Sequence, residues 1–183
     1  MGAIHVLLSL FCVAAFGSPV QPSGHLLRGQ NDLKRSNIVQ LAQRETGVRE
    51  IGNTNRGKRV EEYLAYVSLK GGEPWCAAYI SWIYGKCGYV KPRSAWSPDL
   101  LPTSRLVKSP LPADVFGIYF PELKRIAHVG IVVSRDGDWI LGSEGNTNVD
   151  GSREGNGVYL KRRHIRTIAK YADWVTNGKE VGQ

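Results

Sequence analysis

Apolar residues recur at intervals of three and four positions in the first half of the chain, which is the spacing of one face of an α-helix. The stretches with this spacing cover residues 36–47, 60–67 and 76–88. Ser36 is a residue type that caps helices, and Gly47, Gly71 and Gly88 stand where the patterns stop. The first half therefore predicts three amphipathic helices.

The second half has a different pattern. Five prolines within residues 91–112 exclude long regular elements and predict a connecting loop with room for one short helical turn. Short apolar runs then predict strands at residues 115–120, 128–133, 139–143 and 158–162. The turn at Gly137 predicts a hairpin, and residues 165–175 fit a last strand or a short helix. Helices followed by such strands predict an α+β domain, with N-terminal helices packed on an antiparallel β-sheet.

The two ends of the chain differ from this domain. The apolar run at residues 6–16, followed by Gly17 and Ser18, is too short to span a bilayer and is typical of a secretory signal peptide, although the preceding residues hold His5 and no lysine or arginine. We predict a signal peptide at 1–17, a flexible linker at 18–33, one folded domain at 34–178 and a tail at 179–183. The expected location is secreted, periplasmic or in the cell envelope, with no transmembrane segment.

Composition limits the class of protein. A chain of 183 residues with 42% hydrophobic and 22% charged residues has enough material for one globular domain, and its bulk is not disordered. The formal net charge of +8 favours an acidic partner, which includes nucleic acid, an anionic envelope and lipid headgroups. The chain is expected to be a monomer.

Cysteine usage points to a reactive thiol. Removal of the signal takes Cys12 with it and leaves Cys76 and Cys87. On one continuous helix these two lie about 16 Å apart, whereas a disulfide needs Cα atoms within roughly 7 Å. An exported protein usually pairs its cysteines, so an unpaired Cys76 stands out. Pro74 favours the start of a helix, and a thiol at a helix start has a lowered pKa. Cys87 is expected to be a core residue.

A thiol nucleophile needs a base and a group that orients the base. His164 lies among basic residues that disfavour an imidazolium, whereas His128 opens a predicted strand and has Gly130 two positions on, leaving room beside the ring. Glu144 and Asn146 follow on the next strand, two residues apart and so on one face. Either could accept the imidazole Nδ1–H, the carboxylate by supporting the imidazolium and the amide by orienting it.

Three segments together resemble a known family. Pro74-Trp75-Cys76-Ala77-Ala78-Tyr79, Ala127-His128-Val129-Gly130-Ile131-Val132 and Glu144-Gly145-Asn146, in this order, resemble the CHAP (cysteine, histidine-dependent amidohydrolase/peptidase) family, a branch of the papain-like group that includes the NlpC-type cell-wall peptidases. Residues 47–63 resemble the helical lead-in of bacterial and phage members. The resemblance covers about residues 36–175 and implies a papain-like CHAP fold over the predicted domain.

The resemblance also implies a reaction. The expected substrate is peptidoglycan, cut either as an N-acetylmuramoyl-L-alanine amidase or as an endopeptidase of the stem peptide or cross-bridge, through a thioester. Cys76 is then the nucleophile, His128 the base and Glu144 the third member, with Asn146 as an auxiliary group or the alternative third member. Trp75 and Tyr79 are expected to line the substrate cleft, although the helical spacing of Tyr79 fits a core position equally well.

Other features bear on partners. Some phage members carry an acidic calcium-binding loop before the cysteine, and since no Asp-rich run precedes Cys76, no metal or cofactor is expected. Basic residues could meet the anionic envelope directly, namely Arg56, Lys58, Arg59, Lys161, Arg162, Arg163 and Arg166. An alternative function is a catalytically silent envelope-binding module of the same fold. Nucleic-acid binding is not expected, because the chain lacks an aromatic-basic motif and is predicted to be exported.

Overall fold

The computed structural model describes residues 24–150 and 155–176. The predicted signal peptide at 1–17 and tail at 179–183 lie outside the described residues. The α-helices are α1 (Gly24–Arg44), α2 (Lys58–Tyr66) and α3 (Cys76–Lys86). The strands are β1 (Leu106–Val107), β2 (Val115–Phe120), β3 (Arg125–Asp136), β4 (Trp139–Thr147), β5 (Gly157–His164) and β6 (Lys170–Ala172).

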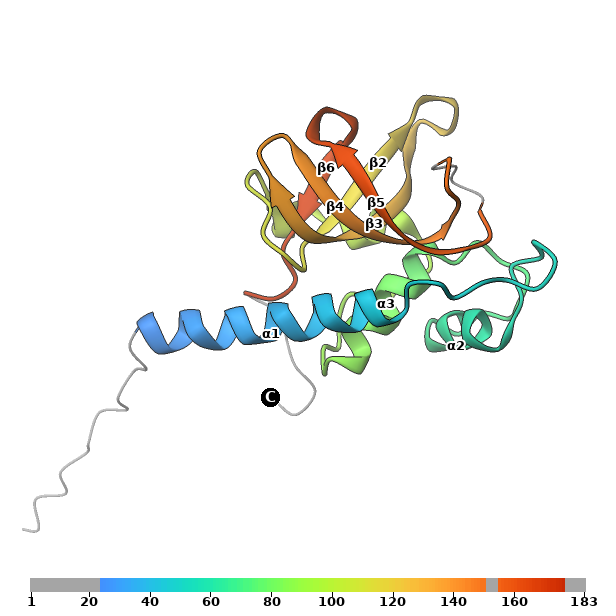
Figure 1. The fold of residues 1–183 in the computed structure, drawn as a ribbon, viewed down its shortest axis with the longest axis horizontal. Helices are drawn as coiled ribbons and strands as arrows, with labels where there is room; N and C mark the ends of the chain where they lie inside the picture. Colours follow the sequence, from blue (N-terminus) through green and yellow to red (C-terminus); the bar gives the residue numbers. More distant parts are fainter. Residues whose placement is uncertain (1–23, 151–154, 177–183) are drawn as a thin grey trace, which may run out of the picture.

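The strands of the described ranges form one antiparallel sheet in the order β1-β6-β2-β3-β4-β5. Gly137, with a φ of +55°, makes the predicted turn between β3 and β4. Helix α3 packs against β3 and β4, α1 packs against β3 and α3, and α2 packs against α3. The helices thus lie together on one side of the sheet (Figure 1), and the predicted α+β class is confirmed.

The alternation of side chains along the strands builds two apolar clusters. Val115 and Ile131 belong to the main core, which also holds the buried face of each helix. Their neighbours Phe116 and Val132 belong to a smaller cluster together with Ile140. The central strands β2 and β3 are therefore apolar on both faces.

The N-terminal helix is longer than the sequence predicts. Residues 18–33 were expected to be a linker, but α1 begins at Gly24, and Ser36 lies inside it instead of capping it. After Pro22 no proline interrupts a segment of good helix formers, and the glycines that suggested a linker are tolerated. Arg35 on this helix is buried and forms ion pairs of 2.7 Å with both Asp114 and Asp173, which hold α1 against the sheet.

Several boundaries also differ from the prediction. Strand β3 begins at Arg125, so His128 lies inside the strand and does not open it. Strand β4 continues beyond residue 143 to Thr147, because the segment with Glu144 still pairs with β5. The proline-rich loop holds two 3-10 turns, η1 (Ser97–Leu100) and η2 (Thr103–Arg105). Residues 165–175 contain both alternatives, a 3-10 turn at Ile165–Thr167 and strand β6.

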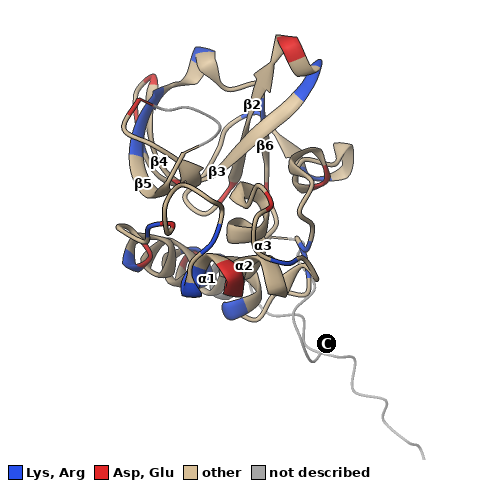
Figure 2. Cartoon of the chain, turned by 90° about the vertical axis from the view of Figure 1, so that its right-hand side faces the viewer, with Lys and Arg blue, Asp and Glu red and all other residues tan. Residues whose placement is uncertain are grey.

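The basic residues do not form one surface. Figure 2 shows Lys and Arg on the helices, along β5 and at hairpin tips, with acidic residues among those on the helices. Arg59 lies 3.2 Å from Glu45 and 2.5 Å from Glu62, so part of its charge is balanced locally. The side chain of Arg163 is mostly buried, because it pairs with buried Glu144. Among the described residues, no helix combines the length and apolar character needed to cross a membrane.

Candidate active site

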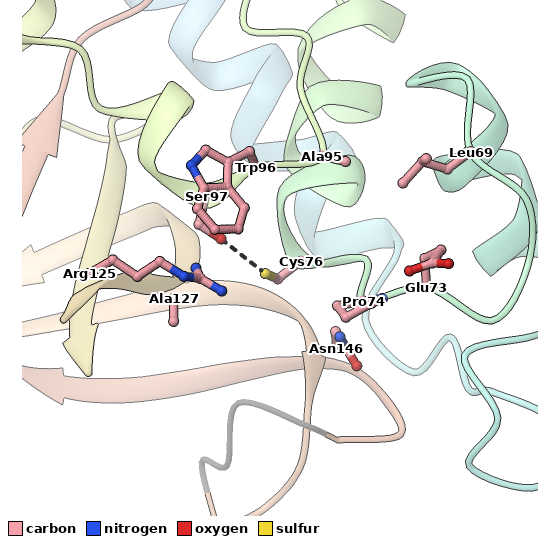
Figure 3. A pocket seen from close by; sticks show the side chains of 10 residues that line it. All are labelled: Leu69, Glu73, Pro74, Cys76, Ala95, Trp96, Ser97, Arg125, Ala127 and Asn146. Atoms are coloured by element: carbon pink, nitrogen blue, oxygen red, sulfur yellow. Dashed lines mark hydrogen bonds between the residues drawn. The ribbon is translucent and has the colours of Figure 1, made fainter. Parts of the chain in front are cut away.

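Cys76 is the first residue of α3, where the sequence predicts a helix to begin. The preceding Gly-Gly-Glu-Pro segment cannot continue a helix, and Trp75 takes the N-cap position. The thiol is 5% exposed and faces a cavity of about 270 Å³ (Figure 3). Its Sγ lies 3.5 Å from Oγ of Ser97, which is the first residue of η1.

The surroundings of the thiol favour its ionised form. Burial opposes ionisation, but attraction from the neighbouring His128, followed by the interactions with Ser97 and the backbone of Val129, outweighs burial and lowers the pKa of Cys76. The same interactions act on the partner. Although burial disfavours the imidazolium, Cys76 and Glu144 raise the pKa of His128 to about 9. Both shifts favour the thiolate–imidazolium pair over the neutral pair.

His128 is oriented through its Nε2 atom. Nε2 donates to Oε2 of Glu144 at 2.8 Å, and both side chains are at most 1% exposed. The expected donor was Nδ1, and in the structure the bond is made by the other ring nitrogen. Nδ1 is buried and has no hydrogen-bond partner, so it is the ring nitrogen that remains available to Cys76. Of the two proposed orienting residues, Glu144 is the one that contacts the ring.

Arg163 on β5 completes this cluster and was not identified as a site residue from the sequence. Its Nε and Nη2 atoms donate to the two oxygens of Glu144 at 2.8 and 2.6 Å. Burial of Glu144 disfavours its charge, but the hydrogen bonds from Arg163 and then His128 lower its pKa. The sequence carried one signal for Arg163. Side chains alternate between the two faces along β5, so Arg163 and the exposed Arg162 point to opposite faces of the sheet. The ionised carboxylate is thus held rigidly behind the imidazole.

Two glycines make room for the carboxylate. A methyl group at Gly130 would lie 2.3 Å from the ring of Phe116 and 2.9 Å from Cγ of Glu144. A methyl group at Gly142 would lie 2.6 Å from the same ring. The ring of Phe116 thus lies over both glycines, and the side chain of Glu144 fits beside it. The space that the sequence predicted next to His128 is present, and it is filled by Phe116 and Glu144.

The hydrogen bonds of Asn146 go to groups other than the imidazole. A β-bulge between Glu144 and Thr147 breaks the pairing of β4 with β5, and Asn146 has a φ of +56°. This breaks the alternation that would place Asn146 and Glu144 on one face. With its amide oriented to satisfy both ends, Asn146 accepts from the N–H of Trp75 at 3.1 Å and donates to the carbonyl of Gly155 at 2.9 Å. Asn146 therefore fixes the N-cap of the Cys76 helix.

Trp75 and Tyr79, expected to bind substrate, are fully buried and do not line the cavity. The Trp75 ring stacks on Tyr63 at 5.6 Å between centroids, and its Nε1 donates to Glu50 at 2.7 Å. The Tyr79 hydroxyl lies 2.7 Å from Oγ of Ser143. Trp75 and Tyr79 therefore pack in the core, which already covers the apolar area of both rings.

The cavity around Cys76 has charged and aromatic walls that the sequence did not reveal. The guanidinium of Arg125 lies 3.9 Å from the ring centre of Trp96, and Trp96 is 49% exposed. Glu73 and Leu69 lie on the opposite side of the thiol (Figure 3). Arg125 and Trp96 come from β3 and from the proline-rich loop, so fold topology and not sequence proximity brings them together. The described residues contain no group of three His, Cys, Asp or Glu side chains that could hold a metal ion.

The two cysteines should differ in their reactivity toward iodoacetamide. Burial raises the pKa of Cys87, whereas that of Cys76 is lowered, and neither forms a disulfide. Because the thiolate is the reacting species, Cys76 should be alkylated at pH 7 at least about tenfold faster than Cys87. Mass spectrometry of peptides after timed quenching measures both rates in one sample. Equal rates would contradict the ion pair.

Comparison of this chain with protein-family models, with curated proteins and with solved structures finds no match. The chemistry is therefore inferred from the geometry described above. A lowered-pKa thiol at a helix start, a raised-pKa imidazole and a carboxylate behind it form the arrangement needed for nucleophilic attack on a carbonyl.

Proposed function

We propose that this chain is an exported cysteine hydrolase that cleaves amide bonds in peptidoglycan, with the papain-like fold and catalytic residues of the CHAP family. The observation that carries the proposal is the connected set of Cys76, His128 and Glu144, with the thiol and the imidazole shifted toward their charged forms. A cysteine with only a packing role requires neither a lowered thiol pKa nor a histidine with a raised pKa beside it. The substrate class comes from the resemblance to cell-wall hydrolases.

The first half of the reaction forms a thioester. The Cys76 thiolate attacks the carbonyl carbon of the amide, and the oxygen takes up the negative charge. Backbone N–H groups in the first turn of α3 are free of the helix ladder and supply hydrogen bonds to that oxygen. As the C–N bond breaks, the His128 imidazolium gives its Nδ1 proton to the leaving nitrogen, so an amine departs.

The second half regenerates the enzyme. The now neutral His128 accepts a proton from water at Nδ1 while the water oxygen attacks the thioester carbon. The C–S bond breaks, the acid is released and the thiolate–imidazolium pair returns. Glu144 stays ionised throughout, because Arg163 lowers its pKa, and its hydrogen bond to Nε2 holds the ring in place.

The walls of the cavity fit the peptide part of such a substrate. Arg125 offers a fixed positive charge to a peptide carboxylate, and stacking on Trp96 holds the guanidinium in place. Glu73 lies across the thiol and matches an amino group. Both charges point to a peptide that carries ionised groups, as the stem peptide of peptidoglycan does.

Digestion of purified peptidoglycan tests the function. The intact protein should release soluble fragments whose masses show one newly hydrolysed amide bond, identified by mass spectrometry. Release of sugar-free peptides indicates an amidase, whereas shortened stems indicate an endopeptidase. Retention of the protein on the wall without any new fragment would contradict the proposal and identify an envelope-binding module.

A further inference from the structure

A second cavity of about 330 Å³ adjoins the first and shares Pro74 and Asn146 with it. Its polar lining consists of Glu50, Asn53, Asn55, Asn146, Asn148 and Asn156. The tetrapeptide Gly-Asn-Thr-Asn occurs twice in the sequence, at residues 52–55 and 145–148. The fold brings both copies to this one cavity, and each contributes two asparagines.

The two copies are joined directly. The Asn146 amide, oriented as above, donates to Oδ1 of Asn55 at 3.3 Å. Asn53, Asn55 and Asn146 all have positive φ angles of +53° to +56°, a conformation that asparagine adopts more readily than most residues. Glu50 holds the first copy in place, because its Oε2 accepts from the N–H of Asn55 at 2.9 Å. The cavity wall is thus built from fixed turns.

The chemistry of this lining differs from that of the first cavity. Asparagine amides present donors and acceptors side by side without charge. Both carboxylate oxygens of Glu50 already accept hydrogen bonds, from Trp75 and from Asn55. A ligand here therefore meets uncharged amides that match hydroxyl and acetamido groups, next to a Glu50 carboxylate whose oxygens are already hydrogen-bonded. An ionised peptide instead finds partners of both charges beside Arg125 and Glu73.

We propose that the asparagine-lined cavity binds the N-acetylated sugar that carries the scissile amide. This inference rests on the proposed function and makes it more specific. With the sugar here and the peptide beside Arg125, the bond over Cys76 is the one that joins the lactyl group of the sugar to the peptide. The acyl group of the thioester then belongs to the sugar, and the peptide leaves as the amine.

Binding without turnover tests this inference. In Cys76→Ala protein, NMR titration with the methyl amide of N-acetylmuramic acid should shift the side-chain amide signals of the cavity asparagines. The double variant Asn53→Gly/Asn148→Ala in the same background should weaken this binding about tenfold, as expected for the loss of two hydrogen bonds. Glycine keeps the positive φ at position 53, so the turn is preserved.

Controls separate this inference from the proposed function. Asn37→Ala changes an exposed asparagine on α1 and should leave the titration unchanged. An unaltered Kd in the double variant, or cavity signals shifted by an L-Ala-D-Glu dipeptide in place of the sugar, would overturn the inference. Peptidoglycan cleavage by the unaltered chain is measured separately. Sugar binding without cleavage would contradict the proposed hydrolase function and leave the sugar site intact. Cleavage without sugar binding contradicts this inference alone.

Discussion

Cys76→Ala is expected to reduce peptidoglycan hydrolysis by at least about 10⁴-fold while the protein stays folded. The reason is that loss of the attacking atom removes the covalent step altogether. The thiol fills a small volume at the edge of the core, so its removal costs little stability. Release of soluble fragments and the thermal unfolding midpoint measure the two effects.

The matched control lies on the same helix. Cys87→Ala makes the same chemical change at the C-cap of α3, where the side chain packs against the core away from the cavity. This variant should retain wild-type hydrolysis. Equal hydrolysis by Cys76→Ala and the unaltered chain would exclude Cys76 as the nucleophile.

Arg163→Met is expected to lower kcat/KM by about 10- to 100-fold. General acid–base catalysis by a positioned group contributes about 10²- to 10⁴-fold to the rate, and the variant should lose only part of this contribution. It should also destabilise the protein by about 2–3 kcal/mol, because one partner of a buried charge is removed. Glu144 is fully buried and keeps His128 as its other partner, while Arg163 is 16% exposed. Methionine preserves the length of the apolar stem, so packing changes less than charge.

The pH dependence of kcat/KM distinguishes a role of Arg163 in positioning Glu144 from a purely structural role. In the unaltered chain, kcat/KM should rise as Cys76 ionises at its lowered pKa and fall as His128 loses its proton near pH 9. Arg163 lowers the pKa of Glu144, so its removal raises that pKa. The carboxylate then becomes protonated earlier as the pH falls, and the acid limb should move to higher pH.

Two further variants complete this experiment. Arg162→Met removes the same charge from the exposed neighbour, which lies over Trp139, and should shift neither limb. Glu144→Gln removes the charge that raises the pKa of His128, so the alkaline limb should move to lower pH. If the acid limb of the pH profile does not move in Arg163→Met, Arg163 only stabilises the fold and does not position the catalytic groups.

Local signals explain what the sequence predicted well. The start of α3 follows from a glycine-rich turn and a proline, and both lie within five residues of Cys76. The bounds of β2 match the apolar run at residues 115–120. His128 and Glu144 could be paired in advance because they lie on consecutive strands joined by a tight hairpin. Each of these inferences needed information from one short segment.

The features that were missed depend on distant or irregular structure. Arg163 lies in a basic run, and its burial follows from the position of β5 beside β4. Asn146 leaves the face of Glu144 because of a bulge, which strand periodicity does not predict. The middle of α1 is held through Arg35 by acidic residues more than 75 positions away. No local pattern encodes those contacts.

The packing of Phe116 over Gly130 and Gly142 has a consequence for how this sequence can diverge. Any side chain at either glycine collides with the aromatic ring, and at Gly130 it also collides with Glu144. A smaller residue at 116 alone would leave a void behind the carboxylate. Positions 116, 130 and 142 are therefore coupled, and replacing Glu144 behind His128 with a larger side chain requires a change at Phe116 first.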